Sequence, residues 1–337
     1  MAIEKIEIID FLVFKNKFTL EFSPGINVFI GGNGTGKTTL LKLIYSGADW
    51  FSMPHYKPDP LEKYFGITNE DIPIGLDYDT KMIMDKLKNR FGAIYLTVNT
   101  KTLNYSFPFI NDLPKKVILS KPVYMPEKDI LEHAKGLLPF IEKKQSGFTS
   151  IYRDVLISAQ DIPTSNQSET QKNICKKIAD IIEGNVYRDE KDGSFYTLKI
   201  DGSRVPFNIE ASGYKKLGIF GLLVSCGQLD PGAVLFWDEP ENSLNPEHMS
   251  TLVDILLELS RNDVQIFIAT HNEIFASYFA VNRKKGDKVM FASLYKEGTT
   301  IMVDTNDRFD LLDPNNLTKE IVKLYEREIE QGLGDNV

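Results

Sequence analysis

Residues 31–38 of this chain read GGNGTGKT and place glycines, a lysine and a threonine at fixed spacing. The pattern G-x-x-x-x-G-K-[ST] is typical of loops that surround phosphate groups. Glycines let backbone N–H groups turn inward and approach the phosphates closely. Lys37 is then placed to reach the outer phosphates, and the Thr38 hydroxyl is placed to bind Mg²⁺. The alternative interpretation is a glycine-rich turn without a ligand.

The elements on either side of this segment agree with that chemistry. Ile26 to Ile30 is predicted as a short buried strand, and Thr38 to Tyr45 as the start of a helix. A helix N-terminus carries partial positive charge, which favours a bound anion. We therefore expect phosphate contacts along the loop and the first helical turn, at Gly32, Asn33, Gly34, Thr35, Gly36, Lys37, Thr38 and Thr39.

A second segment, AVLFWDEP at residues 233–240, is an apolar run that ends in two carboxylates. Such a run is typical of a strand buried on both faces of a parallel sheet. Ligands of open α/β sheets bind at the carboxyl edge, where Asp238 and Glu239 would stand. Asp238 is placed to hold Mg²⁺, and Glu239 to orient or deprotonate an attacking water. The alternative is a strand that ends in a solvated acidic turn.

Three further segments resemble motifs of ABC-type ATPases. Residues 238–246 resemble the Walker B motif and the D-loop, residues 210–217 resemble the signature motif, and residues 266–272 resemble the H-loop. With the P-loop at 31–38, they follow in the order that these ATPases share. The resemblance implies ATP and Mg²⁺ as ligands, and a site that two copies of the chain complete together.

The signature-like segment carries residues for the second copy's nucleotide. The resemblance implies that Ser212 and Gly213 meet the γ-phosphate of ATP held by the partner. Lys216 falls where the SMC-like signature often has a basic residue, and it is a further expected nucleotide contact. The segment departs from the usual pattern at Ala211 and Tyr214.

The H-loop resemblance adds His271, which is expected to contact the γ-phosphate. The catalytic set implied by the resemblance is therefore Glu239, His271 and Lys37, and the metal ligands are Thr38 and Asp238. Asn245 replaces the usual D-loop aspartate.

Within the ABC-type ATPases, the chain most resembles the soluble SMC/OLD-like group, also called AAA15- or AAA21-like. Residues 3–11 and 18–22 resemble its opening hairpin. Residues 123–131 resemble a Pro-x-Lys-[Glu/Asp] segment of OLD-like antiphage-defence ATPases, at the place where transporter ATPases carry the Q-loop. No glutamine stands in that segment. The 66 residues after His271 are too few for the nuclease domain of full OLD proteins.

The fold expected from these motifs is α/β: a P-loop NTPase with an ABC-type ATPase head, a mixed sheet core, an N-terminal antiparallel β-subdomain and an inserted helical lobe. The expected boundaries are 1–128 for the first part of the nucleotide-binding lobe, 129–204 for the helical insertion with its connecting strands, and 205–337 for the second part of the lobe. A helix near residues 81–89, two strands near 91–107 and a last helix over 317–330 are also predicted.

The composition limits the class of protein and the kinds of partner that this chain can have. The 337 residues are 42% apolar and 26% charged, which is ordinary for a globular protein. No apolar run is long enough for a membrane span, and the two cysteines fit a reducing cytoplasm. The net charge of −8 does not indicate a nucleic-acid-binding protein, although local basic clusters leave such contact open.

Two hypotheses of function follow. The first is an ATPase switch, in which two copies clamp two ATP molecules and control a separate effector, such as a toxin or a nuclease, in antiphage defence. The second is a scaffold that binds ATP without hydrolysing it. A DNA-associated repair or maintenance ATPase is a further alternative. Glu239 favours hydrolysis, whereas the altered D-loop and the missing Q-loop glutamine favour the scaffold.

Overall fold

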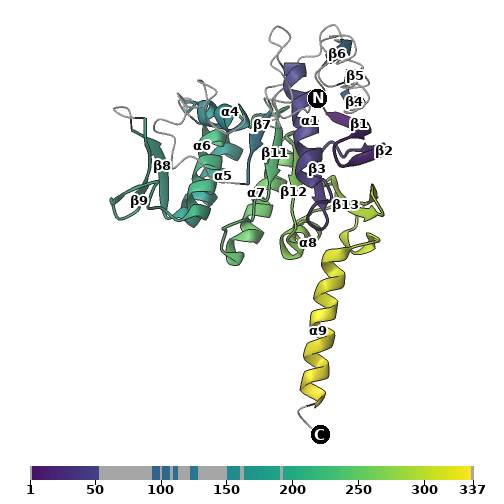
Figure 1. Ribbon diagram of the computed structural model, residues 1–337. Coiled ribbons are helices and arrows are strands. Elements are labelled where there is room, and N and C mark those ends of the chain that lie inside the picture. The colour runs from purple at the N-terminus through teal and green to yellow at the C-terminus, as the bar shows by residue number, and fades with distance from the viewer. Residues whose placement is uncertain are drawn as a thin grey trace, which may run out of the picture.

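The computed structural model describes residues 2–52, 93–98, 101–106, 109–112, 122–127, 150–159, 163–189 and 193–334 (Figure 1). The helix predicted near 81–89 and residues 129–149 of the predicted helical insertion lie outside these residues. The predicted domain boundaries at 128/129 and 204/205 therefore stay predictions.

The core is a six-stranded mixed sheet in the order β14-β13-β3-β12-β11-β7. Five of its strands run parallel, and β14 is antiparallel to β13. The strands are β3 (Ile26–Ile30), β7 (Val123–Met125), β11 (Val234–Asp238), β12 (Gln265–Ala269), β13 (Val289–Glu297) and β14 (Thr300–Asn306). Every residue of β3, β7, β11 and β12 is buried, as expected for strands covered on both faces. Because these strands are parallel, their carboxyl ends meet at one edge of the sheet.

An antiparallel sheet of five strands, in the order β2-β1-β4-β5-β6, lies beside this core. Its strands are β1 (Ile3–Phe11), β2 (Phe14–Glu21), β4 (Ala93–Val98), β5 (Lys101–Ser106) and β6 (Phe109–Asp112). In β2, buried Phe18 and Leu20 alternate with exposed Thr19 and Glu21. This period of two is that of a half-buried strand, and the predicted opening hairpin is confirmed.

Two hydrophobic clusters cover the two faces of the mixed sheet. On one face, α1 (Lys37–Ser52) packs Leu41 and Tyr45 in a cluster with Phe29, Phe236 and Phe267. On the other face, a cluster around Trp237 holds residues of α4 (Ser150–Ser158), α5 (Glu169–Ile182), α6 (Ser212–Ser225), α7 (Met249–Arg261) and α8 (Glu273–Asn282). Alternate side chains of one buried strand thus fix helices on both faces.

A small hairpin sheet places α6. Strands β8 (Gly184–Arg188), β9 (Phe195–Lys199) and β10 (Arg204–Pro206) form a sheet in the order β10-β9-β8. A Cβ added to Gly218 of α6 would lie 2.2 Å from Val186 Cγ2, so α6 lies closer to this hairpin than a larger residue would allow. This contact therefore also sets the position of Ser212, the first residue of α6.

After β13 and β14 the chain forms a 3₁₀ turn, η4 (Phe309–Leu311), and then the helix α9 (Asn316–Gly334), which confirms the last helix predicted over 317–330. Figure 1 shows α9 extending away from the rest of the described chain. None of the helices in the described ranges is both long enough and apolar enough to cross a membrane.

Candidate nucleotide site at the sheet edge

The loop between β3 and α1 has a backbone that requires glycine. Gly31 has φ 143°, and a Cβ there would lie 2.2 Å from the carbonyl oxygen of Leu294. Gly36 has φ 88°, and its Cβ would lie 2.9 Å from Val13 Cγ2. A Cβ on Gly32, by contrast, would meet nothing within 4 Å. The loop is therefore closely packed behind and open in front, as a phosphate cradle should be.

Lys37 lies across this loop. Its Nζ donates hydrogen bonds to the carbonyl oxygens of Gly31 and Gly32, at 2.8 and 3.1 Å. Burial lowers the pKa of this lysine, and the negative charges of Glu239 and Asp238 oppose that shift. No acidic residue stands in the first turn of α1, so the positive end of the helix dipole is available to an anion. These features fit a triphosphate.

Thr38 and Asp238 meet across the sheet edge. The Thr38 hydroxyl donates to Asp238 Oδ1 at 3.1 Å. Asp238 is 4% exposed, and burial raises the pKa of its carboxyl to about 6, with the charges of Glu239 and Glu127 adding to the rise. A divalent cation would favour the ionised form of this carboxylate. The described residues hold no cluster of three or more side chains that could bind a metal on their own, which fits Mg²⁺ completed by phosphates and water.

Glu239 and His271 also meet. The Nδ1–H of His271 donates to Glu239 Oε1 at 2.7 Å. Glu239 has φ 47°, and its backbone N–H donates to the Ala269 carbonyl at 2.8 Å. A backbone hydrogen bond thus joins the turn after β11 to the end of β12. The Glu239 carboxylate therefore lies at the same edge of the sheet as Asp238.

Glu127 is a site residue that the sequence did not reveal. Strand β7 runs parallel to β11, so Glu127, two residues after β7, comes to the same edge. Its Oε1 accepts a hydrogen bond from Asn242 Nδ2 at 3.3 Å, and its charge raises the pKa of Asp238. It stands where the Q-loop glutamine was sought. The segment thus brings an acid rather than an amide to this edge, and residues 128 and 129 lie outside the described ranges.

Glu241 and Thr270 form a second unexpected pair. The Thr270 hydroxyl donates to Glu241 Oε1 and accepts from the backbone N–H of Asn272. Glu241 is 4% exposed, and within the described residues its other oxygen has no hydrogen-bond partner. Burial raises the pKa of this carboxyl. The pair joins the two loops that carry Glu239 and His271.

The Glu241→Gln variant should therefore be more stable than the wild type, by an amount that grows as pH rises. The pKa of Glu241 in the folded protein is higher than its ordinary value of 4.5, so the native state binds the proton more tightly than the unfolded state. The free energy of unfolding of the wild type therefore falls as pH rises from 4.5 through the folded pKa. Glutamine keeps the shape and cannot ionise. The difference in melting temperature between Glu241→Gln and the wild type should grow from pH 5 to pH 8. A difference that is the same at both pH values contradicts this account.

Lys216 is bonded to the turn that carries Glu239. Its buried ammonium donates to the carbonyl oxygens of Glu239 and Asn242, at 3.0 and 3.1 Å. A buried ammonium needs acceptors, and the turn after β11 supplies them. We interpret Lys216 as a residue that positions this turn rather than one that contacts nucleotide.

Ser212 and Gly213 begin α6 beside the D-loop. A Cβ on Gly213 would lie 2.5 Å from the carbonyl oxygen of Ser243, so α6 and the D-loop are in close contact. Neither residue is hydrogen bonded to the loop at 31–38 in the described part of the chain. The structure brings together Lys37, Thr38, Asp238, Glu239 and His271.

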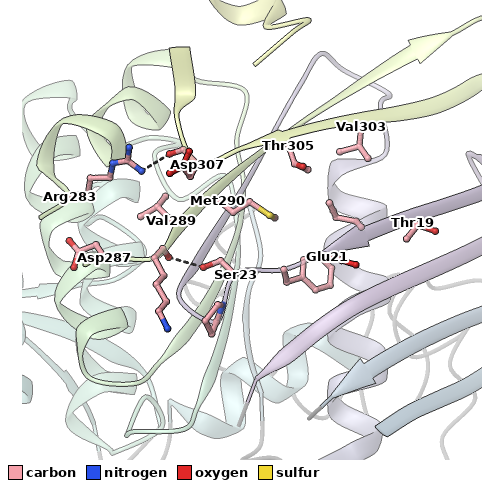
Figure 2. A pocket seen from close by; sticks show the side chains of 14 residues that line it. Thr19, Glu21, Ser23, Arg283, Asp287, Val289, Met290, Val303, Thr305 and Asp307 are labelled. Atoms are coloured by element: carbon pink, nitrogen blue, oxygen red, sulfur yellow. Dashed lines mark hydrogen bonds between the residues drawn. The ribbon is translucent and has the colours of Figure 1, made fainter. Parts of the chain in front are cut away.

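A cleft of about 780 Å³ lies at a different place (Figure 2). It is lined by Ser23 before β3 and by Val289 and Met290 at the start of β13, which is the amino edge of the sheet. Arg283 in this cleft donates to the carbonyl oxygen of Asp307, and no glycine cradle or helix N-terminus faces it. The phosphate chemistry belongs to the opposite edge.

Two family models match the sequence. One, described as "AAA ATPase domain", matches residues 1–133. The other, described as "AAA domain, putative AbiEii toxin, Type IV TA system", matches residues 127–277. Together they cover the glycine loop, the Walker B pair and the H-loop. No curated protein matches the sequence.

Solved structures of similar fold are heads of SMC proteins. An Smc head from Pyrococcus furiosus, with an extended coiled coil and bound to the C-terminal domain of ScpA, has a TM-score of 0.50 at 13% identity, over 97% of this chain and 99% of that one. An SMC head domain from Thermotoga maritima has a TM-score of 0.47 at 13% identity, over 90% of this chain and 98% of that one. At this identity, the likeness concerns the fold alone.

The chain has the fold of a P-loop ATPase head, the fold that SMC heads share. The two family models identify it as an ATPase of the AAA15/AAA21 group, as the sequence motifs predicted. Membership supports an ATP-binding and ATP-hydrolysing function.

Proposed function

We propose that this protein is an ATP-hydrolysing switch, in which two copies close around two ATP molecules and control a separate effector. One observation carries the proposal: the two carboxylates at the end of β11 are held at the sheet edge, Asp238 by Thr38 and Glu239 by His271. A domain that only binds ATP needs the first pair and has no need of the second.

The residues divide the chemistry between them. The loop backbone and Lys37 bind the triphosphate, and Thr38 and Asp238 hold Mg²⁺, with Glu127 close to the same carboxylate. Mg²⁺ supplies neutralisation of the charge that develops on the phosphates. Glu239 accepts the proton of the attacking water, and His271 orients this carboxylate through its Nδ1–H.

The partner copy supplies the signature residues. Ser212 stands at the N-terminus of α6, and no acidic residue lies in the first turn of that helix. A second γ-phosphate approaching this end would meet the hydroxyl and the positive end of the helix dipole. In the described part of the chain Ser212 makes no hydrogen bond to its own loop at 31–38, which supports a site completed between two copies.

The Ser212→Arg variant should bind ATP and fail to hydrolyse it. Arginine would fill the space that the partner's γ-phosphate needs, while the loop at 31–38 stays intact. Calorimetry should give an affinity close to that of the wild type, and phosphate release should fall to background. Ser203→Arg, at an exposed turn serine, is the matched control and should keep full activity. Full activity of Ser212→Arg would contradict the shared site.

The output of the switch is control of a separate effector. The description of the family model over residues 127–277 names a toxin and a toxin–antitoxin system, which supports control of a toxin or nuclease in antiphage defence. The non-hydrolysing scaffold remains the second candidate, because Asn245 replaces the D-loop aspartate. Steady-state phosphate release by the purified chain separates the two: the switch requires turnover, and the scaffold requires none.

A further inference from the structure

The turn after β11 holds Glu239 in a backbone conformation that few residues other than glycine adopt. Its φ of 47° lies in the left-handed region. The Asn242 N–H donates to the Glu239 carbonyl at 3.1 Å, which closes a turn with Pro240 at its second position. A backbone of this kind persists only where the surrounding structure holds it. The position of the Glu239 carboxylate therefore depends on what fixes this turn.

Glu241, in the same turn, connects it to the loop after β12. The Thr270 hydroxyl donates to Glu241 Oε1, and the two residues are 0% and 4% exposed. A hydrogen bond that is withdrawn from water is stronger than an exposed one, because the local dielectric constant is low. This side-chain bond thus adds to the backbone bond between Glu239 and Ala269, which joins the same two segments.

The same hydroxyl fixes the backbone on both sides of His271. Thr270 donates its own N–H to the Phe29 carbonyl at 3.0 Å, and its hydroxyl accepts from the Asn272 N–H at 2.9 Å. Asn272 in turn caps α8, since its Oδ1 accepts from the Phe275 N–H at 3.0 Å. The His271 side chain is 53% exposed, so its direction depends on this loop rather than on packing around the ring.

We infer that Glu241 and Thr270 are positioning residues for ATP hydrolysis. Their hydrogen bond holds the turn of Glu239 and the loop of His271 in register, so that the two side chains meet at 2.7 Å. The inference rests on the proposed function, because it requires that the chain hydrolyse ATP.

Binding of ATP depends on other contacts. Lys37 is bonded to the carbonyl oxygens of Gly31 and Gly32, and Thr38 is bonded to Asp238. None of these bonds involves Glu241 or Thr270. Loss of the positioning bond should therefore lower kcat and leave the affinity for MgATP nearly unchanged.

The first test is Thr270→Val, which keeps the shape of the side chain and removes the hydroxyl. Its kcat should fall on the order of 10–100-fold, as expected for a small misplacement of catalytic groups. Calorimetry should give an ATP affinity close to that of the wild type. Thr270→Ser keeps the hydroxyl and should retain most of the rate, and Thr305→Val, at an exposed threonine of β14, is the control. A Thr270→Val variant with wild-type kcat, or with kcat and affinity lost in parallel, overturns the inference.

The second test asks whether the two residues act as one unit. Glu241→Leu should slow hydrolysis as Thr270→Val does, and Glu241→Gln, which keeps an oxygen that can accept from Thr270, should slow it much less. The double variant Glu241→Leu/Thr270→Val should be no slower than the slower single variant, because the bond can be lost only once. A double variant whose loss is the product of the two single losses contradicts a shared role.

Amide hydrogen exchange gives a readout that does not depend on turnover. The Glu239 N–H, which is bonded to the Ala269 carbonyl, should exchange faster in Thr270→Val than in Thr270→Ser. Equal exchange in the two variants overturns the inference. A wild type without turnover refutes the hydrolysing switch itself and the positioning role with it, whereas an active wild type with an equally active Thr270→Val refutes the positioning role alone.

Discussion

Replacing Glu239 by glutamine is expected to lower the rate of ATP hydrolysis by about 10²–10⁴-fold while ATP binding survives. Glutamine keeps the shape of the side chain and removes the base that accepts the proton of the attacking water. Lys37, Thr38 and Asp238 are unchanged, so MgATP is still held. A phosphate-release assay and calorimetry on the same preparation measure the two effects.

Two comparisons make this result specific. Glu247→Gln changes an exposed glutamate in the 3₁₀ turn after the D-loop and should hydrolyse ATP normally. Asp238→Asn should weaken both binding and hydrolysis, because it disturbs the residue that holds Mg²⁺. If Glu239→Gln turns over at the wild-type rate, Glu239 is not the base and the scaffold gains support.

The Lys37→Ala variant should lose ATP affinity by about 100-fold or more, since hydrogen bonds to charged groups contribute about 1.5–3 kcal/mol each. Without this ammonium, Asp238 and Glu239 would also repel the triphosphate more strongly. Calorimetry and the ATP-dependent rise in melting temperature both report the loss. Lys15→Ala, at an exposed lysine of β2, is the control. Unchanged affinity in Lys37→Ala would refute the assignment of the phosphate loop.

Local patterns made the centre of the site predictable. Strand, glycine loop and helix follow each other within residues 26–45, so the geometry of the loop depends on neighbours in sequence. The apolar run before Asp238 likewise indicated a buried parallel strand, and β11 is that strand. These elements were predicted because each carries its own periodicity and its own turn residues.

The residues that were missed depend on contacts between distant segments. Glu127 reaches the site because β7, only three residues long, pairs with β11 more than a hundred positions later. Glu241 meets Thr270 because β11 and β12 end side by side. Lys216 was predicted as a nucleotide contact from its place in a motif, and this stays a prediction; its hydrogen bonds to the carbonyls of the turn after β11 were not predicted. No local pattern encodes these pairings.

The most direct test of a site shared between two copies is the mixing of two inactive variants in a phosphate-release assay. Lys37→Ala retains Ser212, and Ser212→Arg retains Lys37. Neither should hydrolyse ATP alone. In an equimolar mixture, mixed pairs form one intact site each, and activity should return to about a quarter of the wild-type value for a symmetric dimer. A mixture that stays inactive, although each variant is folded, would contradict the shared site and with it the proposed switch.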